Sequence, residues 1–186
     1  MGGESMATPK ILLTGPPGIG KTTVIKRLAS SLGERARGFY TEEQREGGKR
    51  VGFVAVTLRG RRAVLAHIGF PSPLKVGKYH VNPQGLDEAL EELEEALVEG
   101  GKILLVDEIG KMELLIPRFR EVIERVLSSP WPVVATVPAK PVPYTDEVKK
   151  RPGFTLIEVN RDNRDLLPSK LLNLLVVPPE LEKQGR

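Results

Sequence analysis

The sequence contains no cysteine, two histidines and one tryptophan among its 186 residues. Without cysteine it has no disulfide, no thiolate nucleophile and no cysteine-ligated zinc or iron–sulfur site. His67 and His80 stand alone, with no second ligand at a spacing typical of metal sites, which argues against a histidine-bound metal. The chemistry of this protein must therefore rely on other side chains.

Long hydrophobic runs are missing as well. No apolar segment approaches the roughly 20 residues that a membrane-spanning helix needs, and no signal-peptide pattern opens the chain. The first residues resemble an N-myristoylation signal, but Met6 stands where that signal has serine or threonine. We therefore expect a cytoplasmic protein without a membrane partner, in which residues 1–8 form a flexible leader.

Charge of one sign is only slightly in excess. The chain has 28 Lys and Arg against 24 Asp and Glu, which gives a formal net charge of +4. Such an excess suits phosphate-bearing ligands, but a solvated surface explains it equally well. The charge therefore allows a nucleic-acid partner without supporting one, and the oligomeric state stays open.

Glycine and proline are plentiful, with 19 and 16 residues, and they divide the chain into alternating strands and helices. The hydrophobic patterns predict strands at residues 10–14, 36–43, 51–58, 61–68, 102–108, 132–137 and 154–159. They predict helices at residues 21–32, 85–101, 117–127 and 162–175, and no regular element at 69–83. This order favours an α/β fold with a mostly parallel sheet, flanked by helices on both faces and carrying an antiparallel β-hairpin insertion. We expect residues 9–176 to form a single domain and residues 177–186 a loose tail.

Two charged segments are expected to face solvent. The helix at 85–101 carries a stripe of leucines, and its acidic residues cover the rest, which favours a solvated face over a metal site. The basic run at 149–151 is too short to argue for nucleic acid. Trp131, between two prolines, is expected to be a packing residue.

The segment GPPGIGKTT, residues 15–23, is too rich in glycine and proline to pack well in a core, but its composition suits the binding of an anion. It matches the phosphate-binding pattern G-x-x-x-x-G-K-[ST] at every fixed position and lies between a predicted strand and a predicted helix. Its glycines let successive backbone N–H groups point inward, and the helix adds the positive end of its dipole. We therefore predict that the nucleotide phosphates are bound by Gly15, Pro16, Pro17, Gly18, Ile19, Gly20, Lys21, Thr22 and Thr23.

Five side chains have separate expected roles. The Lys21 ammonium can reach the outer phosphates and is a candidate catalytic group, while Thr23 is expected near the inner phosphate. The apolar strand at 102–108 ends in Asp107, which can hold Mg²⁺ opposite the Thr22 hydroxyl. Glu108 follows directly and can orient and polarise an attacking water, which makes it the candidate catalytic base.

Several longer segments carry a resemblance to one family. The phosphate loop, GFYTEE followed by GFVAVTL, VGKYHVN, DEIGKMEL and NRDNRDLLP occur in this order from about residue 10 to residue 175. Together they resemble the small nucleoside-triphosphatases, a group that includes thermophile enzymes and the human cancer-related nucleoside-triphosphatase. The resemblance implies a RecA-like P-loop NTPase fold and Mg²⁺-dependent hydrolysis of ATP, GTP, CTP and UTP to diphosphates and phosphate. It also implies that Asn163 and Arg164 lie near the base or ribose.

The roles of several other polar residues stay open. Thr41 and Thr136 each either face the γ-phosphate or are bonded within the fold. Lys111 either pairs with Glu108, touches a phosphate or is a surface lysine. An arginine finger, if the chain supplies one, comes from three candidates, Arg118, Arg120 and Arg164.

Two other functions use the same phosphate loop. A small nucleotide or metabolite kinase needs an acceptor pocket and usually an arginine-bearing lid, and no segment here has the pattern of such a lid. A dedicated GTP switch needs the guanine-reading Asn-Lys-x-Asp element, which is absent because NRDN and NRDL lack the lysine. Hydrolysis is therefore the expected function, with a kinase and a nucleic-acid-linked ATPase or switch as alternatives.

Overall fold

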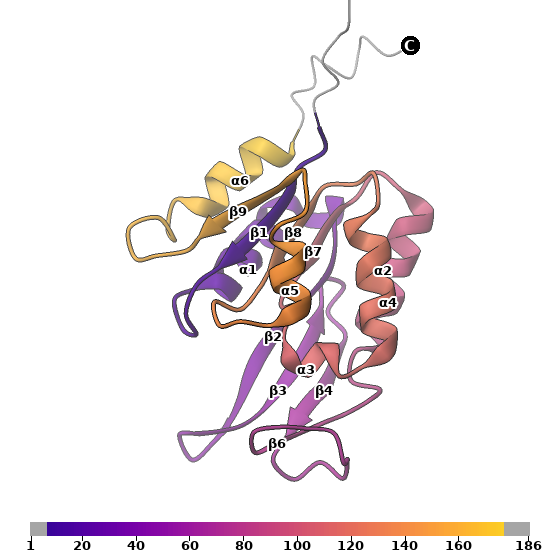
Figure 1. Cartoon of the computed structure of the whole chain (residues 1–186), viewed down its shortest axis with the longest axis vertical. Helices are drawn as coiled ribbons and strands as arrows, with labels where there is room; N and C mark the ends of the chain where they lie inside the picture. The colour runs from indigo at the N-terminus through magenta and orange to yellow at the C-terminus, as the bar shows by residue number, and fades with distance from the viewer. Residues whose placement is uncertain (1–6, 177–186) are drawn as a thin grey trace, which may run out of the picture.

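The structure, a computed structural model, describes residues 7–176. The expected tail and most of the expected leader lie outside the described residues, and only Ala7 and Thr8 of the leader are placed. Figure 1 shows an extended sheet with helices on both faces. Within the described residues, no helix is long and apolar enough to cross a membrane.

Among the described residues, nine strands form one sheet in the order β5-β6-β4-β3-β2-β7-β8-β1-β9. Their bounds are β1 Lys10–Thr14, β2 Ala36–Glu46, β3 Lys49–Thr57, β4 Arg62–His67, β5 Lys75–Val76, β6 Tyr79–Val81, β7 Ile103–Val106, β8 Val133–Thr136 and β9 Phe154–Glu158. Strands β2, β7, β8, β1 and β9 pair in parallel and are called the parallel half. Strands β3, β4, β6 and β5 continue the sheet from β2 as antiparallel pairs and are called the antiparallel extension.

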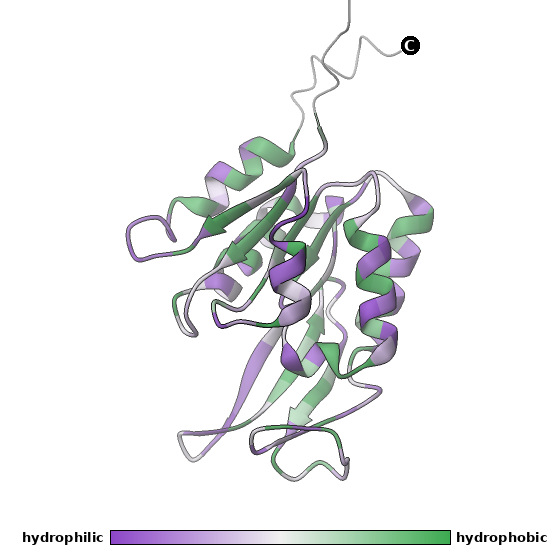
Figure 2. Ribbon diagram, viewed as in Figure 1, coloured by the Kyte–Doolittle hydropathy of each residue, from purple (hydrophilic) through white to green (hydrophobic). Residues whose placement is uncertain are grey.

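The helices cover both faces of the parallel half. Their bounds are α1 Lys21–Leu32, α2 Asp87–Glu99, α3 Lys111–Leu114, α4 Pro117–Leu127, α5 Pro143–Val148 and α6 Leu167–Leu175, with a 3-10 turn at Gly33–Arg35. Helices α1 and α6 share one apolar core with Ile11 and Leu13, while α2, α4 and α5 share the other with Leu12. Because the centre of β1 is buried on both faces, its three central residues form a continuous apolar run (Figure 2). The expected α/β architecture is confirmed.

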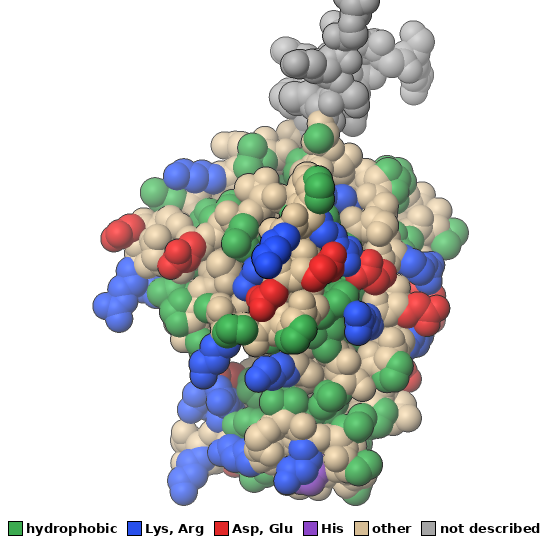
Figure 3. All heavy atoms as spheres, viewed as in Figure 1, with side chains coloured by type: hydrophobic (Ala, Val, Ile, Leu, Met, Phe, Trp, Pro, Cys, Tyr) green, Lys and Arg blue, Asp and Glu red, His purple; other side chains and the backbone are tan. Residues whose placement is uncertain are grey.

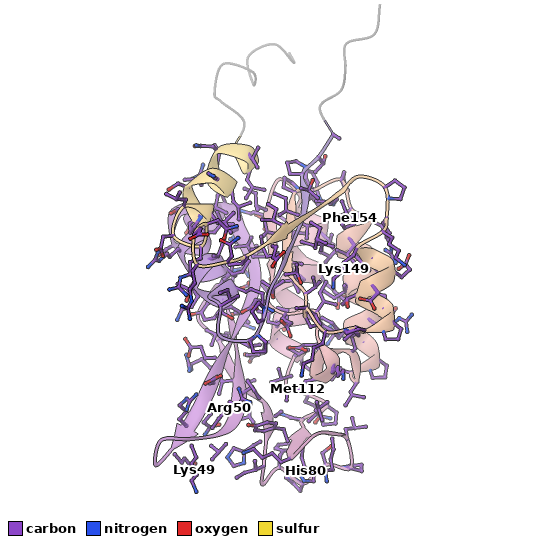
Figure 4. The ribbon with its side chains drawn as sticks, turned by 60° about the vertical axis from the view of Figure 1, so that its left-hand side comes forward. Lys49, Arg50, His80, Met112, Lys149 and Phe154 are labelled. Carbon is purple, nitrogen blue, oxygen red and sulfur yellow. The ribbon has the colours of Figure 1, made fainter. Side chains whose placement is uncertain are left out.

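The segment 69–83, expected to lack regular structure, contains β5 and β6. The antiparallel insertion is therefore a four-stranded extension and not a simple hairpin. Gly77, at φ +57°, lies in the turn between the two strands, and strands of two and three residues leave no alternation for sequence analysis to detect. Figure 4 shows Lys49, Arg50 and His80 at the far end of this extension, away from Lys149 and Phe154.

The last helix begins at Leu167 and not at residue 162. The Asn160 side-chain oxygen accepts hydrogen bonds from the N–H groups of Asp162 and Asn163, both at 2.9 Å. The Asn163 amide in turn donates to the Glu158 carbonyl at 2.8 Å. These side-chain bonds favour a turn over a helix, so Asn163 and its neighbour Arg164 lie in the loop between β9 and α6. The short helices α3 and α5 were also not predicted.

The acidic face of α2 is not wholly solvated, contrary to expectation. Glu92 is 4% exposed and accepts hydrogen bonds from the N–H groups of Gly38 (2.7 Å), Leu58 (3.3 Å) and Arg59 (3.1 Å). At Gly38, a Cβ atom would overlap the Leu105 carbonyl of β7, so only glycine fits at this position of β2. Because its partners lie in β2 and just after β3, Glu92 fixes α2 to the junction where the extension joins the parallel half.

The basic run at 149–151 is also only partly solvated. Lys150 is exposed, but Arg151 pairs with Glu124 (2.8 Å) and Glu147 (2.7 Å), which links α4 to α5. Exposed Lys and Arg side chains are also visible over the antiparallel extension (Figure 3). Trp131 packs against the apolar core, as expected.

Candidate active site

Adjacent parallel strands bring three chain segments to one edge of the sheet. Strand β8 lies between β1 and β7 and is parallel to both, so the carboxyl ends of the three strands meet. The phosphate loop, residues 15–23, follows β1, while Asp107 and Glu108 follow β7 and Thr136 ends β8. Ligands of open parallel sheets bind beyond this edge. The structure thus places the phosphate loop beside the paired carboxylates.

The phosphate loop turns on its three glycines. Gly15, Gly18 and Gly20 have φ values of 153°, 79° and 116°, which other residues rarely adopt. The Ile19 N–H donates to the Pro16 carbonyl at 3.2 Å and closes the turn. Helix α1 starts directly after Gly20, with no acidic residue in its first turn and no side-chain cap. Its first N–H groups are therefore available to an anion.

The Lys21 side chain lies folded over this loop. Its ammonium donates to the carbonyls of Gly15 (2.7 Å) and Val137 (3.4 Å), and its Nζ lies 3.5 Å from Glu108 Oε2. Only 10% of the side chain is exposed. A single positive charge therefore stands between the loop and the Glu108 carboxylate.

Asp107 is buried and held by three donors. The Thr136 hydroxyl donates to Oδ1 (2.6 Å), the Thr22 hydroxyl to Oδ2 (2.7 Å), and the Thr41 N–H to Oδ2 (3.4 Å). Burial raises the pKa of Asp107, while these hydrogen bonds and the Lys21 charge oppose the rise. Thr136 therefore holds this carboxylate through its side chain, whereas Thr41 contacts it through the backbone N–H alone.

The oxygen atoms of Thr22 and Asp107 fit a small divalent cation. Hydroxyl and carboxylate oxygens are hard donors that suit Mg²⁺, which is usually held by one or two carboxylates together with waters and substrate phosphates. Among the described residues, no group of three or more His, Asp or Glu could hold a metal. A cation at this position would therefore take its remaining ligands from waters and a bound phosphate.

Glu108 lies next to Asp107 and beside Lys21. Its side chain is 30% exposed, and desolvation raises its pKa above the ordinary value. The Lys21 charge lowers this pKa, and the Asp107 charge raises it. A carboxylate with a raised pKa is a stronger base than an exposed one, so Glu108 is suited to accept a proton from water.

A third carboxyl group, Glu113, lies just after the acid pair in the sequence, which predicted no role for it. It is 6% exposed on α3, and both it and Glu108 lie against Gly110, which precedes that helix. Burial first, and the Glu108 charge second, raise the pKa of Glu113 well above its ordinary value. A glutamate at the third position of a helix can reach back toward the N–H group at the start of that helix, which favours burial of its carboxyl group. This pattern can be recognised in the sequence only when the position of α3 is known.

A cavity of about 270 Å³ opens beside the phosphate loop. Its lining consists of Gly18, Gly20, Thr23, Arg27, Arg164 and Asp165. Arg164 reaches across it and donates to the Ile19 carbonyl at 3.1 Å. Asn163, expected beside Arg164, is not part of the lining, because its side chain bonds the Glu158 carbonyl and the Asn160 N–H. The cavity thus joins the phosphate loop to the loop between β9 and α6.

Comparison with known proteins identifies the family. The model of a family described as NTPase matches residues 10–172. The chain belongs to this NTPase family. The nucleoside-triphosphatase THEP1 of Thermotoga petrophila is 49% identical over 167 residues, which cover 89% of this chain and 92% of the relative.

Two solved structures resemble this NTPase. The crystal structure of THEP1 from Aquifex aeolicus has a TM-score of 0.83 at 39% identity, covering 90% of this chain and 99% of that chain. The solution structure of a human cancer-related nucleoside triphosphatase has a TM-score of 0.76 at 33% identity, covering 96% and 100%. These similarities confirm the expected P-loop NTPase fold.

The described contacts of two arginines weighed from the sequence are with elements other than the phosphate loop of this NTPase. Arg118 is engaged in ion pairs with acids of α2, and Arg120 stacks over the Tyr144 ring, 4.8 Å from its centroid. Lys111 is exposed. Of the three candidate arginines, Arg164 is the one whose described contacts include the phosphate loop.

Proposed function

We propose that this NTPase is a Mg²⁺-dependent nucleoside-triphosphatase that hydrolyses nucleoside triphosphates to diphosphates and inorganic phosphate. The observation that carries the proposal is the meeting of two pairs, Lys21 with Glu108 and Thr22 with Asp107, around one glycine loop. The relatives named above bear the name nucleoside-triphosphatase, which supports the same activity.

The phosphate loop and Lys21 bind the triphosphate. The N–H groups of the loop and of the first turn of α1 donate to the phosphate oxygens. Lys21 exchanges its bonds to the Gly15 and Val137 carbonyls for bonds to the outer phosphates. Because an ammonium there neutralises charge on the γ-phosphoryl group as it transfers, Lys21 stabilises the transition state.

Thr22 and Asp107 would hold Mg²⁺. When bound, the cation neutralises negative charge on the β- and γ-phosphate oxygens. The Thr136 hydroxyl donates to Oδ1 of Asp107, which holds the carboxylate beside the Thr22 hydroxyl, where these two residues would bind the cation. Thr136 is thus a positioning residue for the metal ligand.

Glu108 activates the attacking water. Its carboxylate accepts a proton from the water, whose oxygen bonds to the γ-phosphorus as the bond to the bridging oxygen of the leaving diphosphate breaks. Lys21 Nζ lies 3.5 Å from Glu108 Oε2. Movement of Lys21 to the phosphates therefore frees this carboxylate for water.

The cavity beside the loop accepts the nucleoside. Arg27 and Arg164 line it, and a guanidinium can stack on any base or bond a ribose or phosphate oxygen. Asn163, whose amide could read one base, is instead committed to the Glu158 carbonyl. This arrangement favours a loose preference among ATP, GTP, CTP and UTP.

The test is a phosphate-release panel over these four nucleotides, with Mg²⁺ and with a chelator. It compares the parent, Glu108→Gln and the exposed α4 control Glu121→Gln. We expect release only with Mg²⁺, an unchanged control, and a loss of roughly 10²–10³-fold in Glu108→Gln. Calorimetry should show that Glu108→Gln still binds nucleotide, because the loop and Lys21 are intact.

Other outcomes would redirect the assignment. If Glu108→Gln turned over like the parent, Glu108 would not be the base. Phosphate transfer to a nucleoside or nucleotide acceptor that outpaced hydrolysis would indicate a kinase. A large stimulation by RNA or DNA would indicate a nucleic-acid-linked ATPase.

A further inference from the structure

Glu113 is a buried carboxyl group for which the proposed hydrolysis provides no task. It is 6% exposed and lies in the short helix α3, directly after the segment that carries Asp107 and Glu108. Burying a carboxyl group is unfavourable unless nearby groups compensate for the lost water. The neighbours of Glu113 therefore indicate what it does.

Gly110 brings Glu113 close to the proposed base. A Cβ atom built on Gly110 would lie 2.7 Å from Glu108 Oε1 and 2.9 Å from Glu113 Oε2. The two carboxyl groups therefore flank the same side of Gly110, where not even a methyl group has room. The other oxygen of Glu108, Oε2, faces Lys21 at 3.5 Å. Glu108 thus lies between an ammonium and a buried carboxyl group.

We propose that Glu113 is a positioning residue for Glu108. It fills the space beside Gly110, so the Glu108 carboxylate cannot turn inward and stays directed at Lys21 and the phosphate loop. The backbone of Glu113 belongs to the first turn of α3, which is closed by the hydrogen bond from the Leu114 N–H to the Gly110 carbonyl at 3.0 Å. The proposal rests on the proposed function, because Glu113 acts through Glu108 alone.

A merely structural Glu113 would do no more than cap α3. Its loss would then lower the melting temperature and leave the turnover of the folded enzyme unchanged. If Glu113 positions Glu108, its loss should instead lower kcat and leave the nucleotide affinity unchanged. A misplacement of about 1 Å at a reacting group can cost about 10²-fold in rate.

The experiment compares the parent with Glu113→Gln, Glu113→Ala and Gly110→Ala, with Glu121→Ala on α4 as an exposed control. The measurements are kcat and KM for Mg·ATP, calorimetric affinity for a non-hydrolysable ATP analogue, and melting temperature. We expect Glu113→Ala and Gly110→Ala to lower kcat by about 10²-fold with KM and affinity unchanged. Gly110→Ala should act because its methyl group displaces the flexible carboxylate ends.

The conservative variant and a double mutant sharpen the test. Glu113→Gln keeps the shape of the side chain, so it should retain most of the parental kcat. In the Glu108→Gln background, Glu113→Ala should cause no further loss in single-turnover hydrolysis, because the group that it positions is already gone. A full additional loss in that background would overturn the proposal.

The remaining outcomes are also decisive. A Glu113→Gln enzyme as slow as Glu113→Ala would overturn positioning by shape, and parental kcat in Gly110→Ala would do so even if Glu113→Ala failed to fold. If Glu108→Gln is inactive while the Glu113 and Gly110 variants are fully active, only this inference falls. If Glu108→Gln turns over like the parent, the proposed function fails and this inference falls with it.

Discussion

The two parts of the sheet use similar contacts in different surroundings. In the parallel half, the buried Asp107 accepts hydrogen bonds from Thr136 at 2.6 Å and Thr22 at 2.7 Å. In the antiparallel extension, Arg50 and Glu43 pair at 3.0 Å with 41% of each side chain exposed. An exposed ion pair contributes about 0–1 kcal/mol, whereas leaving a buried polar group without its partner costs about 1–3 kcal/mol. Solvent exposure, more than contact distance, therefore determines how much these polar contacts contribute to stability in the two regions.

The largest expected contrast is in catalysis. Lys21→Ala should lower kcat/KM by about 10³-fold, because it removes the charge nearest the outer phosphates. Arg50→Ala removes a cation of the extension and should leave kcat/KM unchanged. Phosphate release at saturating Mg²⁺ measures both variants. An equal loss in Arg50→Ala would show that the extension takes part in the reaction.

Two buried threonines give the next contrast. Thr136→Val leaves Asp107 Oδ1 without its donor, which should cost about 1–3 kcal/mol of unfolding free energy and roughly tenfold in kcat. Thr57→Val removes the hydroxyl that accepts the Arg61 N–H at 3.1 Å in the extension. It should cost about 0.5–1.5 kcal/mol and no activity. Urea unfolding and steady-state kinetics on both variants test this, and a fully active Thr136→Val enzyme would contradict it.

The pH dependence of stability should differ in sign between the two regions. Because burial raises the pKa of Glu113 above its ordinary 4.5, the folded protein holds a proton that the unfolded chain has lost. The contribution of Glu113 to stability is therefore present below that ordinary value and is lost as pH rises through the raised pKa. Glu113→Gln should melt higher than the parent near neutral pH, with the difference vanishing in acid. A melting difference that stayed constant with pH would contradict the assigned shift.

The smallest effect is expected at Glu43. Hydrogen bonding to Arg45 lowers the pKa of Glu43. Its contribution is therefore present above the ordinary pKa and is lost as pH falls through the lowered value. Glu43→Gln should cost no more than about 1 kcal/mol, and salt should shrink that cost. Unfolding at low and high ionic strength measures it, and a larger, salt-independent cost would place this pair with the buried contacts.

The phosphate loop could be predicted because its chemistry is contiguous in sequence. Gly15 to Thr23 carry the turn, the charge and the hydroxyl in one segment, between a strand and a helix that their own patterns identify. Asp107 and Glu108 could also be predicted as site residues, because they directly follow an apolar strand that the sequence identifies. The sheet order then brings the two segments together.

Glu92 and Glu113 could not be predicted, because acids on helices normally face water. The burial of Glu92 depends on N–H groups that the sheet brings from elsewhere in the chain, and that of Glu113 on the fold of the segment around Gly110. The start of α6 was placed too early because the Asn160 side chain stabilises a turn where the pattern continued as a helix. The hydrophobic pattern of a segment gives no information about such contacts of its polar side chains.

The Gly38 junction has a consequence for how the molecule can move. Through Glu92, α2 is bonded at once to Gly38 of β2 and to Leu58 and Arg59 beyond β3. Bending the sheet at this seam would break several bonds to a buried carboxylate together. We therefore expect the extension to move with β2 as one stiff unit.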